Sequence, residues 1–383
     1  MRFCVDAHAI GRNLTGNEVF VRNLLDGLAV QDDASEFVAY LSSPEAAAWI
    51  PERFRWRLVS RNPFVRLGYD LPRKLRKDRP AMLHVQYTAP LRCPVPVVAS
   101  VHDVSFLEHP EYFHGPRAVQ LGWSVRRTIR MAARVLTPSE FSRRAILKNC
   151  RVDDDKIVVV PYAVSSGLRP MAREQATGQV RRRYGIAGPY ILTVGDLQPR
   201  KNQIGLIRAF EELAGSHPHL AHRLVLVGQD TWFGPRVRKA AAQSRFSDRI
   251  HFTGFVADGD LLPLYGGCDL FVFPSFYEGF GLPILEAMAC GRAVACSNTS
   301  AMPEVADAAG ILFDPHSTAP MVGAMRDILL DGELRGRLER LGQQWAGRFS
   351  WRETARRHLN VYYEVASDSG AARQSAPVAV RRS

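Results

Sequence analysis

Short apolar segments alternate with longer amphipathic stretches along the whole chain. Each apolar segment has the length of one buried strand, and the stretch after it has the residue spacing that is typical of a helix. This alternation predicts an α/β protein with parallel sheets, because parallel strands need a crossover helix between them. The predicted strands are 3–6, 37–41, 82–86, 97–102, 135–138 and 157–162 in the first half, and 190–194, 224–227, 250–253, 270–274, 293–296 and 311–313 in the second.

The two sets of strands predict two Rossmann-like domains of similar size. A chain of 383 residues is too long for one ordinary core and long enough for two. Residues 165–188, between the two sets, are polar and poor in strand formers, which indicates a linker and a short helix. We expect domains at 1–165 and 166–350, a helix at 351–367 that packs back on the N-terminal domain, and a disordered tail at 368–383.

The amino-acid composition argues against a membrane-spanning, a secreted or a disulfide-rich protein. The chain is 46% hydrophobic and 23% charged, as in ordinary globular proteins. No apolar run approaches the roughly 18–20 residues that span a bilayer, and the N-terminus lacks the features of a signal peptide. The six scattered cysteines form no Cys-x-x-Cys pair, which argues against a disulfide framework and a zinc site. We therefore expect a cytoplasmic protein.

Positive charge is in excess and unevenly distributed. The net charge is +12, and residues 61–92 hold eight Arg or Lys against two acids. A second group, Arg126, Arg127, Arg130 and Arg134, lies on a predicted helix. Such patches suit anionic headgroups, nucleic acid or an anionic substrate, and the chain has no nucleic-acid-binding motif. We expect peripheral contact with an anionic membrane at its inner face; a merely solvated basic face is the alternative.

The segment 195–202 follows a predicted strand directly. It begins with Gly195 and ends with Arg200, Lys201 and Asn202, where the next helix starts. A strand, a glycine turn and a helix place backbone N–H groups toward a phosphate in α/β proteins. Arg200 and Lys201 would add a fork of donors and a point charge for a diphosphate. Without other evidence, the pair is more simply read as a solvated turn.

The segment 274–291 carries a stronger signal. A buried strand runs into the sequence Glu-Gly-Phe-Gly-Leu-Pro-Ile-Leu-Glu, from Glu278 to Glu286, with Pro283 in the first turn of a predicted helix. Gly279 and Gly281 allow backbone to approach a ligand closely. Two carboxylates at the carboxyl end of a sheet can accept hydrogen bonds from vicinal hydroxyl groups of a sugar or ribose. For either acid alone, a helix-start or loop charge would be the simpler explanation.

The segment from Glu278 to Gly291 resembles the signature of the retaining enzymes of glycosyltransferase family 4. Residues 195–202 and 253–256 are similar to the phosphate turn and the nucleotide-base loop of that family. The resemblance implies a GT-B fold, with two Rossmann-like domains facing a central cleft, the acceptor on the N-terminal domain and the donor on the C-terminal one. It also implies that Arg200 and Lys201 hold the diphosphate, Glu286 the ribose, and Glu278 the transferred sugar. Further donor-binding residues would be Gly16, Gly195, Val256, Gly279, Phe280, Gly281 and Leu282.

The segment His-Asp-Val-Ser-Phe-Leu-Glu-His-Pro, residues 102–110, ends a predicted strand of the first half. It resembles a segment of family members that are mannosyltransferases, in which the His contacts the donor sugar. We therefore expect His102 in the cleft, with Asp103 and Ser139 on the acceptor side, although a lone His at a strand end is more often structural. The loop with Gly11 and Gly16 resembles the family loop that closes over the diphosphate. Because it departs from the usual glycine and aromatic spacing, its role is open.

The sequence predicts no bound metal and no cofactor. Asp258-Gly259-Asp260 has the spacing of the metal site of another glycosyltransferase fold, but it precedes an apolar helical segment, so an N-cap role for one Asp is favoured. Arg200 and Lys201 can neutralise a leaving diphosphate themselves. The NDP-sugar donor is a co-substrate.

The predicted function is a metal-independent retaining hexosyltransferase. It would move mannose from GDP-mannose to a hydroxyl of a glycan or lipid-linked acceptor in cell-surface polysaccharide synthesis. Two alternatives stay open: an NDP-sugar 2-epimerase of GT-B fold, which needs no acceptor, and a catalytically silent sugar-nucleotide-binding protein. The sequence contains no G-x-G-x-x-G loop that would indicate a nicotinamide dehydrogenase.

Overall fold

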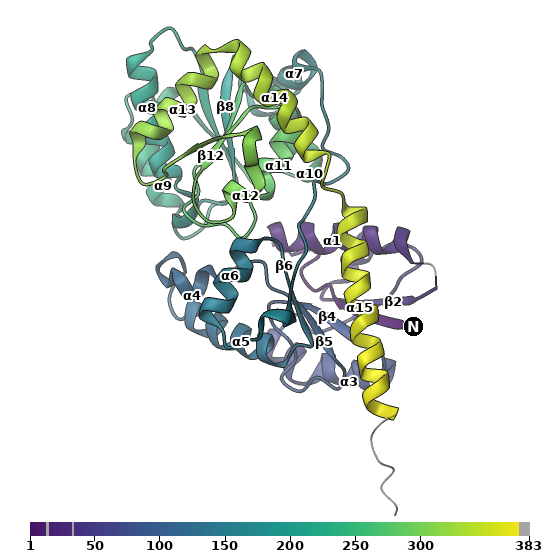
Figure 1. The fold of residues 1–383 in the computed structure, drawn as a ribbon. Coiled ribbons are helices and arrows are strands. Elements are labelled where there is room, and N and C mark those ends of the chain that lie inside the picture. The colour runs from purple at the N-terminus through teal and green to yellow at the C-terminus, as the bar shows by residue number, and fades with distance from the viewer. Residues whose placement is uncertain (13–14, 33, 375–383) are drawn as a thin grey trace, which may run out of the picture.

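The computed structural model describes residues 1–12, 15–32 and 34–374 and contains two parallel β-sheets, each flanked by helices (Figure 1). The first sheet has the strand order β3-β2-β1-β4-β5-β6-β7, and the second has the order β10-β9-β8-β11-β12-β13. All strand pairs are parallel. The predicted α/β class with two parallel sheets is confirmed.

The N-terminal domain consists of the first sheet and the helices between its strands. Its strands are β1 (Arg2–Asp6), β2 (Glu36–Leu41), β3 (Arg55–Leu58), β4 (Met82–Gln86), β5 (Val97–Ser100), β6 (Arg134–Thr137) and β7 (Ile157–Val159). Its helices are α1 (Thr15–Gln31), α2 (Pro63–Val65), α3 (Leu71–Asp78), α4 (Ser105–Glu108), α5 (Arg117–Met131) and α6 (Glu140–Asn149), with short turns η1 (Pro44–Trp49), η2 (Arg66–Asp70), η3 (Pro110–Tyr112) and η4 (Asp154–Lys156).

The C-terminal domain repeats this plan around the second sheet. Its strands are β8 (Tyr190–Val194), β9 (Arg223–Val227), β10 (Ile250–Gly254), β11 (Leu270–Phe273), β12 (Val294–Ser297) and β13 (Ile311–Phe313). Its helices are α7 (Arg173–Tyr184), α8 (Gln203–Ser216), α9 (Gly234–Gln243), α10 (Asp258–Gly267), α11 (Leu282–Ala289), α12 (Met302–Ala306), α13 (Thr318–Leu330) and α14 (Gly332–Ala346), with short turns η5 (Pro199–Lys201), η6 (Ser247–Arg249) and η7 (Asp307–Ala309).

Strand β3 is absent from the strands expected from the sequence. Its residues, Arg-Trp-Arg-Leu, are all exposed, and it pairs only with β2 at the edge of the sheet. An exposed edge strand lacks the continuous apolar run that marks a strand buried on both faces. Because its two arginines interrupt the apolar pattern, the sequence did not predict this strand.

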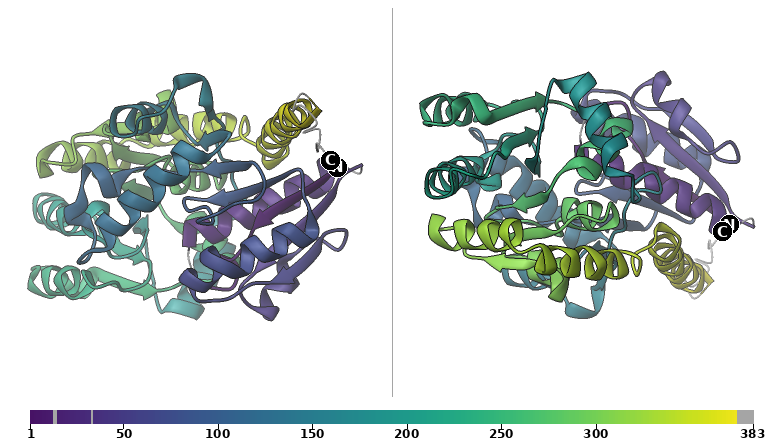
Figure 2. Two further views of the ribbon diagram at one scale, coloured as in Figure 1. Left: turned by 90° about the horizontal axis from the view of Figure 1, so that it is seen from below. Right: turned by 90° about the horizontal axis from the view of Figure 1, so that it is seen from above.

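The last helix, α15 (Trp351–Gln374), returns from the C-terminal domain and packs across α1 of the N-terminal domain (Figures 1 and 2). Tyr362 donates or accepts a 2.7 Å hydrogen bond with His84 Nδ1 of β4, and the Tyr363 hydroxyl bonds to Asp32 at 2.6 Å. The helix continues to Gln374, into the segment that was expected to be a disordered tail. Residues 375–383 lie outside the described part of the chain.

Three apolar clusters hold the molecule together. One lies in each domain, on one side of its sheet. The third runs from β1 and α1 through Tyr162 and Phe280 into the C-terminal domain and includes Tyr362 of α15. Apolar contact therefore crosses the domain boundary.

Candidate active site

Two chain turns meet at the carboxyl edge of the second sheet. Strands β8 and β11 are hydrogen-bonded neighbours, so the turn after β8 and the loop after β11 leave the sheet side by side. The N–H of Phe276 in the second loop donates to the carbonyl of Arg200 in the first at 2.7 Å. Asn202, with φ 52°, then redirects the chain into α8. The topology therefore brings residues far apart in sequence to one place.

Glu278 forms ion pairs with both Arg200 and Lys201. Its Oε2 lies 2.7 Å from Arg200 Nη1, and its Oε1 lies 2.6 Å from Lys201 Nζ. Arg200 Nη1 also donates to the carbonyl of Tyr277 at 3.1 Å, and Lys201 Nζ lies 4.8 Å from the centre of the Phe273 ring. The three charged side chains, which we call the charge cluster, are largely buried.

The charge cluster shifts the pKa values of its members. Burial raises the pKa of Glu278, but the charges of Arg200 and Lys201 outweigh burial and lower it to about 2. Burial lowers the pKa of Arg200, and Glu278 reverses this, so that it stays above its ordinary value. Burial lowers the pKa of Lys201 more than Glu278 raises it. Two basic groups thus share one carboxylate, and the cluster suits a further anionic group.

Gly195 leaves the space that the Lys201 side chain occupies. A Cβ on Gly195 would lie 3.2 Å from Lys201 Cδ and Cε, and the φ of this residue is 155°. A larger residue would push the lysine side chain away from Glu278. Of the expected donor residues, Gly195, Arg200, Lys201 and Glu278 are therefore brought together.

Glu286 lies one turn away from the start of α11 and is buried. Its Oε2 accepts a 2.7 Å hydrogen bond from the hydroxyl of Tyr265 in α10. Gly281, with φ 101°, precedes α11 and Leu282 is its first residue. The first N–H groups of a helix have no partner within it, so the 279–282 backbone can donate to a ligand at this edge.

The loop from Glu278 to Gly281 also touches the N-terminal domain. The carbonyl of Gly279 accepts hydrogen bonds from the Ser139 and Ser142 hydroxyls, at 2.6 and 3.0 Å. A Cβ on Gly279 would lie only 2.0 Å from the carbonyl oxygen of His102. Phe280 packs on Tyr162, with ring centres 5.4 Å apart. This position requires glycine because two backbones meet there.

His102 follows β5 of the first sheet, and both of its ring nitrogens form hydrogen bonds. Its Nε2 lies 3.0 Å from Gln86 Oε1, and its Nδ1 bonds to the hydroxyl of Tyr162. Burial, with a smaller effect of His358, lowers its pKa to about 3, so the ring is neutral at physiological pH. The two partners of the imidazole, Gln86 and Tyr162, both belong to the N-terminal domain.

The two residues expected on the acceptor side, Asp103 and Ser139, both bond to neighbouring parts of the chain. The Ser139 hydroxyl is buried, caps α6 and donates to the carbonyl of Gly279. Asp103 Oδ1 accepts from the N–H and hydroxyl of Ser105, at 2.8 and 2.6 Å, and thereby holds its own loop.

Two further expected donor residues, Val256 and Gly16, lie after β10 and in α1. Val256 is buried in the core cluster that runs between the domains, after the exposed Phe255. Gly16 is exposed in the first turn of α1, and a Cβ there would meet no atom within 4 Å. Residues 13–14 beside it lie outside the described residues.

Several partners were missed from sequence: Tyr265 for Glu286, Gln86 and Tyr162 for His102, and Ser142 for Gly279. Gln86 alone carried a signal, as a polar residue at the carboxyl end of a predicted strand. The others depend on contacts between distant segments.

The family follows from comparison with known proteins. The model of "Glycosyl transferases group 1" matches residues 180–345, and that of "Glycosyltransferase Family 4" matches residues 14–166. O-antigen chain mannosyltransferase B of Escherichia coli is 34% identical over 266 residues, which is 69% of each chain. The chain belongs to glycosyltransferase family 4.

Other similar proteins agree with this assignment. A serotype-specific mannosyltransferase WbdA of Escherichia coli is 29% identical over 70% of this family 4 chain, which matches only 33% of WbdA. Sucrose-phosphate synthase from Thermosynechococcus elongatus superposes with a TM-score of 0.78 at 17% identity, over 96% of this chain and 99% of that one. WaaG, a glycosyltransferase involved in lipopolysaccharide biosynthesis, gives 0.75 at 17% identity, over 94% and 99%. The predicted GT-B fold is confirmed.

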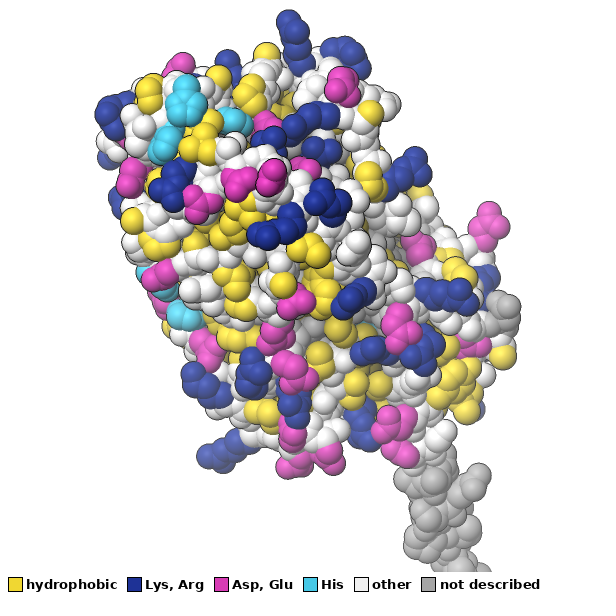
Figure 3. Space-filling view, turned by 45° about the horizontal axis from the view of Figure 1, so that its top comes forward, with side chains coloured by type: hydrophobic (Ala, Val, Ile, Leu, Met, Phe, Trp, Pro, Cys, Tyr) yellow, Lys and Arg dark blue, Asp and Glu magenta, His cyan; other side chains and the backbone are white. Residues whose placement is uncertain are grey.

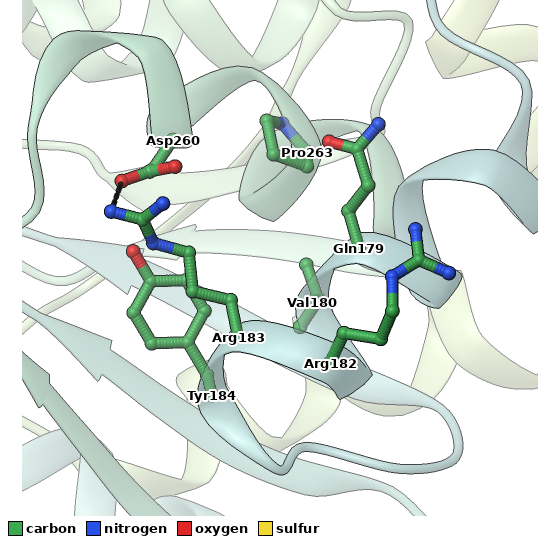
Figure 4. A pocket seen from close by; sticks show the side chains of 7 residues that line it. All are labelled: Gln179, Val180, Arg182, Arg183, Tyr184, Asp260 and Pro263. Atoms are coloured by element: carbon green, nitrogen blue, oxygen red, sulfur yellow. Dashed lines mark ion pairs between the residues drawn. The ribbon is translucent and has the colours of Figure 1, made fainter.

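A pocket between α7 and α10 of this family 4 enzyme lies apart from the charge cluster (Figure 4). Gln179, Arg182, Tyr184 and Pro263 are among its lining residues, and Arg183 Nη2 pairs with Asp260 Oδ2 at 2.7 Å.

The Asp258-Gly259-Asp260 segment belongs to α10. The N-cap of this helix is Ala257, so the prediction that one of the two Asp residues is the N-cap is wrong. Within the described residues, no three His, Cys, Asp or Glu side chains are grouped so as to hold a metal ion.

Replacing Glu278 by Gln should leave Arg200 and Lys201 buried without their carboxylate. We expect the free energy of unfolding to fall by about 3–5 kcal/mol, the usual cost of breaking a buried pair. Since the Glu278 pKa is about 2, against an ordinary 4.5, this stability is present above pH 4.5 and is lost as the pH falls toward 2. Pyrophosphate should raise the melting temperature of Glu278→Gln more than that of the wild type, because it supplies the missing charge.

Glu353→Gln is the matched control, because Glu353 loses the same charge from an exposed pair with Arg356 and Arg357. Thermal unfolding with and without pyrophosphate measures both variants. Equal pyrophosphate shifts in the wild type and Glu278→Gln would show that the cluster does not bind anions.

Replacing Gly279 by Ala should separate the donor loop from His102, because the new Cβ overlaps the His102 carbonyl. We expect glycosyl transfer to fall by about a hundredfold, the typical effect of a displacement of about 1 Å at a reacting centre, while circular dichroism stays unchanged. Gly323→Ala in α13, where a Cβ meets no atom within 4 Å, should keep full activity. Unaltered transfer in Gly279→Ala would contradict the role of this contact.

Proposed function

We propose that this glycosyltransferase transfers mannose from GDP-mannose to a hydroxyl of a glycan or lipid-linked acceptor. The anomeric configuration is retained, and the product belongs to a cell-surface polysaccharide. The observation that carries the proposal is the charge cluster, in which two buried basic groups share one carboxylate. A nucleoside diphosphate supplies the negative charge that this arrangement accommodates. The choice of mannose is supported by the two mannosyltransferase relatives and by the His102 segment.

The proposed reaction follows from where charge develops. As the sugar–phosphate bond breaks, negative charge grows on the diphosphate, and Arg200, Lys201 and the start of α8 stabilise it. Glu278 then holds the two basic groups in place and contacts the sugar, while Glu286 binds the ribose. No step requires a metal ion. The acceptor hydroxyl attacks from the face that the diphosphate leaves, and a phosphate oxygen takes its proton.

In this scheme, His102 positions neighbouring groups and does not transfer a proton. Because its imidazole is neutral and bonded to Gln86 and Tyr162, we assign it neither acid nor base chemistry. It holds the cleft wall against Gly279 and the transferred sugar. Tyr87, whose ring centre lies 5.1 Å from that of His102, supports it from the other side.

Replacing Lys201 by Ala should lower GDP-mannose turnover by at least about a hundredfold, since it removes a preorganised charge from the leaving group. NDP release is measured with several NDP-sugars, with and without a mannose-containing glycolipid acceptor. Lys239→Ala, at an exposed lysine of α9, should behave as the wild type.

The same assay separates the alternatives. Acceptor-dependent NDP release supports a transferase, and conversion of the NDP-sugar without acceptor indicates an epimerase. Donor binding without any turnover indicates a silent binding protein. Undiminished turnover in Lys201→Ala would overturn the assigned role of the cluster.

We also propose that the N-terminal domain contacts an anionic membrane surface at the cytoplasmic face. Phe64 and Tyr69 of the α2–η2 segment are 76% and 64% exposed, and Leu91 beside them is 52% exposed. The N–H of Leu91 donates to the carbonyl of Leu67 at 3.0 Å, which joins the two segments into one surface. Exposed basic residues surround it: Arg61, Arg73, Arg76, Lys77, Arg79 and Arg92.

Exposed aromatic residues among basic ones suit the interface of an anionic bilayer. Not every basic residue of this region takes part, because Lys74 pairs with Asp70 and Arg66 is buried. On the face shown in Figure 3, which is mostly the C-terminal domain, positive and negative side chains are interspersed. No helix among the described residues is long and apolar enough to cross a membrane.

Replacing Phe64 and Tyr69 by Ser should weaken binding to vesicles that contain phosphatidylglycerol by about tenfold or more, because each ring buries apolar area in the interface. Leu330→Ser, at an exposed apolar position of α13, is the control. Co-sedimentation at increasing salt measures the effect. Equal binding of all variants would exclude this surface as the contact.

A further inference from the structure

The segment 299–304 holds the backbone of Glu278. The N–H of Glu278 donates to the Ser300 hydroxyl at 3.0 Å, and the N–H of Ala301 donates to the Glu278 carbonyl at 3.4 Å. Ser300 has φ 54°, a conformation that is uncommon for a residue other than glycine and that persists only where the surrounding structure imposes it. The segment therefore fixes the backbone from which the Glu278 carboxylate reaches its two basic partners.

The end of the same segment, in α12, meets the start of α6 across the domain boundary (Figure 1). Glu304 Oε2 accepts a 2.9 Å hydrogen bond from the N–H of Glu140, the first residue of α6, and Glu304 Oε1 pairs with Arg144 Nη2 at 3.1 Å. The first N–H groups of a helix have no partner inside it, and a carboxylate is favoured at this positive end. Glu304 thus caps α6 from the other domain.

The first turn of α6 also contacts the loop that carries Glu278. The hydroxyl of its N-cap, Ser139, accepts from the N–H of Ser142, and both hydroxyls donate to the carbonyl of Gly279. The C-terminal domain therefore holds the start of α6 at two points. One is Gly279, next to Glu278 in the chain, and the other is Glu304, whose segment holds the Glu278 backbone.

Of the two contacts of Glu304, the hydrogen bond from the Glu140 N–H contributes more to the contact between the domains. The side chains of Arg144 and Glu304 are 65% and 33% exposed, and an ion pair exposed to this extent contributes little. Losing a hydrogen bond to a charged group changes an equilibrium constant by about tenfold or more. Capping of α6, and not the ion pair, therefore links Glu304 to the N-terminal domain.

We propose that Glu304 is a positioning residue for the transfer reaction. It caps α6 across the domain boundary and thereby fixes the N-terminal domain against the loop that carries Glu278. Without this cap, the charge cluster keeps all its side chains, but the arrangement that binds the donor is less populated. The apparent affinity for the donor falls in proportion to that population, and saturating donor restores the arrangement. This role rests on the proposed function, whereas the contact itself is measurable without a donor.

The N–H of Glu140 can be removed without breaking α6. Proline is tolerated at the first position of a helix, and Ser139 before it has φ −147° and ψ 158°, an extended conformation of the kind that precedes proline. Glu140→Pro removes the donor of the hydrogen bond, and Glu304→Ala removes its acceptor. Glu140→Ala is the matched control, because it loses the same side chain and keeps the N–H. Arg144→Ala loses only the ion pair.

We expect Glu304→Ala and Glu140→Pro each to raise the donor KM by about tenfold, with a change in kcat of less than about threefold because saturating donor restores the arrangement. The double variant should be no worse than either single variant, since both remove the same interaction. Glu140→Ala and Arg144→Ala should stay within about threefold of the wild-type KM. Melting temperatures verify that every variant is folded.

A second measurement needs no nucleotide. Hydrogen–deuterium exchange followed by mass spectrometry should be faster at 139–144 and at 276–281 in Glu304→Ala and Glu140→Pro than in Glu140→Ala, because both segments lose the contact that holds them together.

Several results would overturn the proposal. An unchanged donor KM in Glu304→Ala, or additive effects in the double variant, would show that this contact does not position the site. An equal rise of KM in Arg144→Ala or Glu140→Ala would assign the effect to surface charge instead of the helix cap. Faster exchange at both segments, in a protein that turns over no NDP-sugar, would refute the proposed function and leave the contact standing.

Discussion

The Glu278 carboxylate between Arg200 and Lys201 is the interaction on which the site depends. Removing three charged groups from water is expensive, and in the interior only mutual pairing offsets that cost. The pairing fixes the turn after β8 against the loop after β11, and each segment thereby holds the other at the sheet edge. Because two basic groups share one carboxylate, the arrangement is stable and still suited to a further negative charge. In the proposed function, the atoms that stabilise this turn are also the ones that bind the donor diphosphate.

The same loop joins the two domains. Gly279 allows its backbone to meet the backbone of His102, and the Ser139 and Ser142 hydroxyls hold its carbonyl. The donor-side loop is thus positioned by the acceptor-side domain. This contact couples the two domains, because displacing one of them also moves the loop that carries Glu278.

The α2–η2 segment of the N-terminal domain presents different groups on its two sides. It carries exposed aromatic rings on its outer side, and Arg66 of the same segment turns inward to Asp6. Helix α15 braces this domain from behind through Tyr362 and Tyr363, which ties it to the end of the C-terminal domain.

The sequence by itself determined the two parallel sheets and most of their strands, because burial on both faces leaves apolar runs that can be read locally. It also determined the family and the residues of the charge cluster, since the glycine and acid spacing around Glu278 is a local pattern. It missed β3, whose arginines and exposure conceal an edge strand, and it took Arg66 for a surface charge. Only the tertiary structure decided that Arg66 is buried beside Asp6, that Ser139 faces the donor loop, and that both nitrogens of His102 are engaged. Each of these contacts joins segments that are far apart in the sequence. The order of the strands in the sheets, and not the type of residue, decides which segments meet.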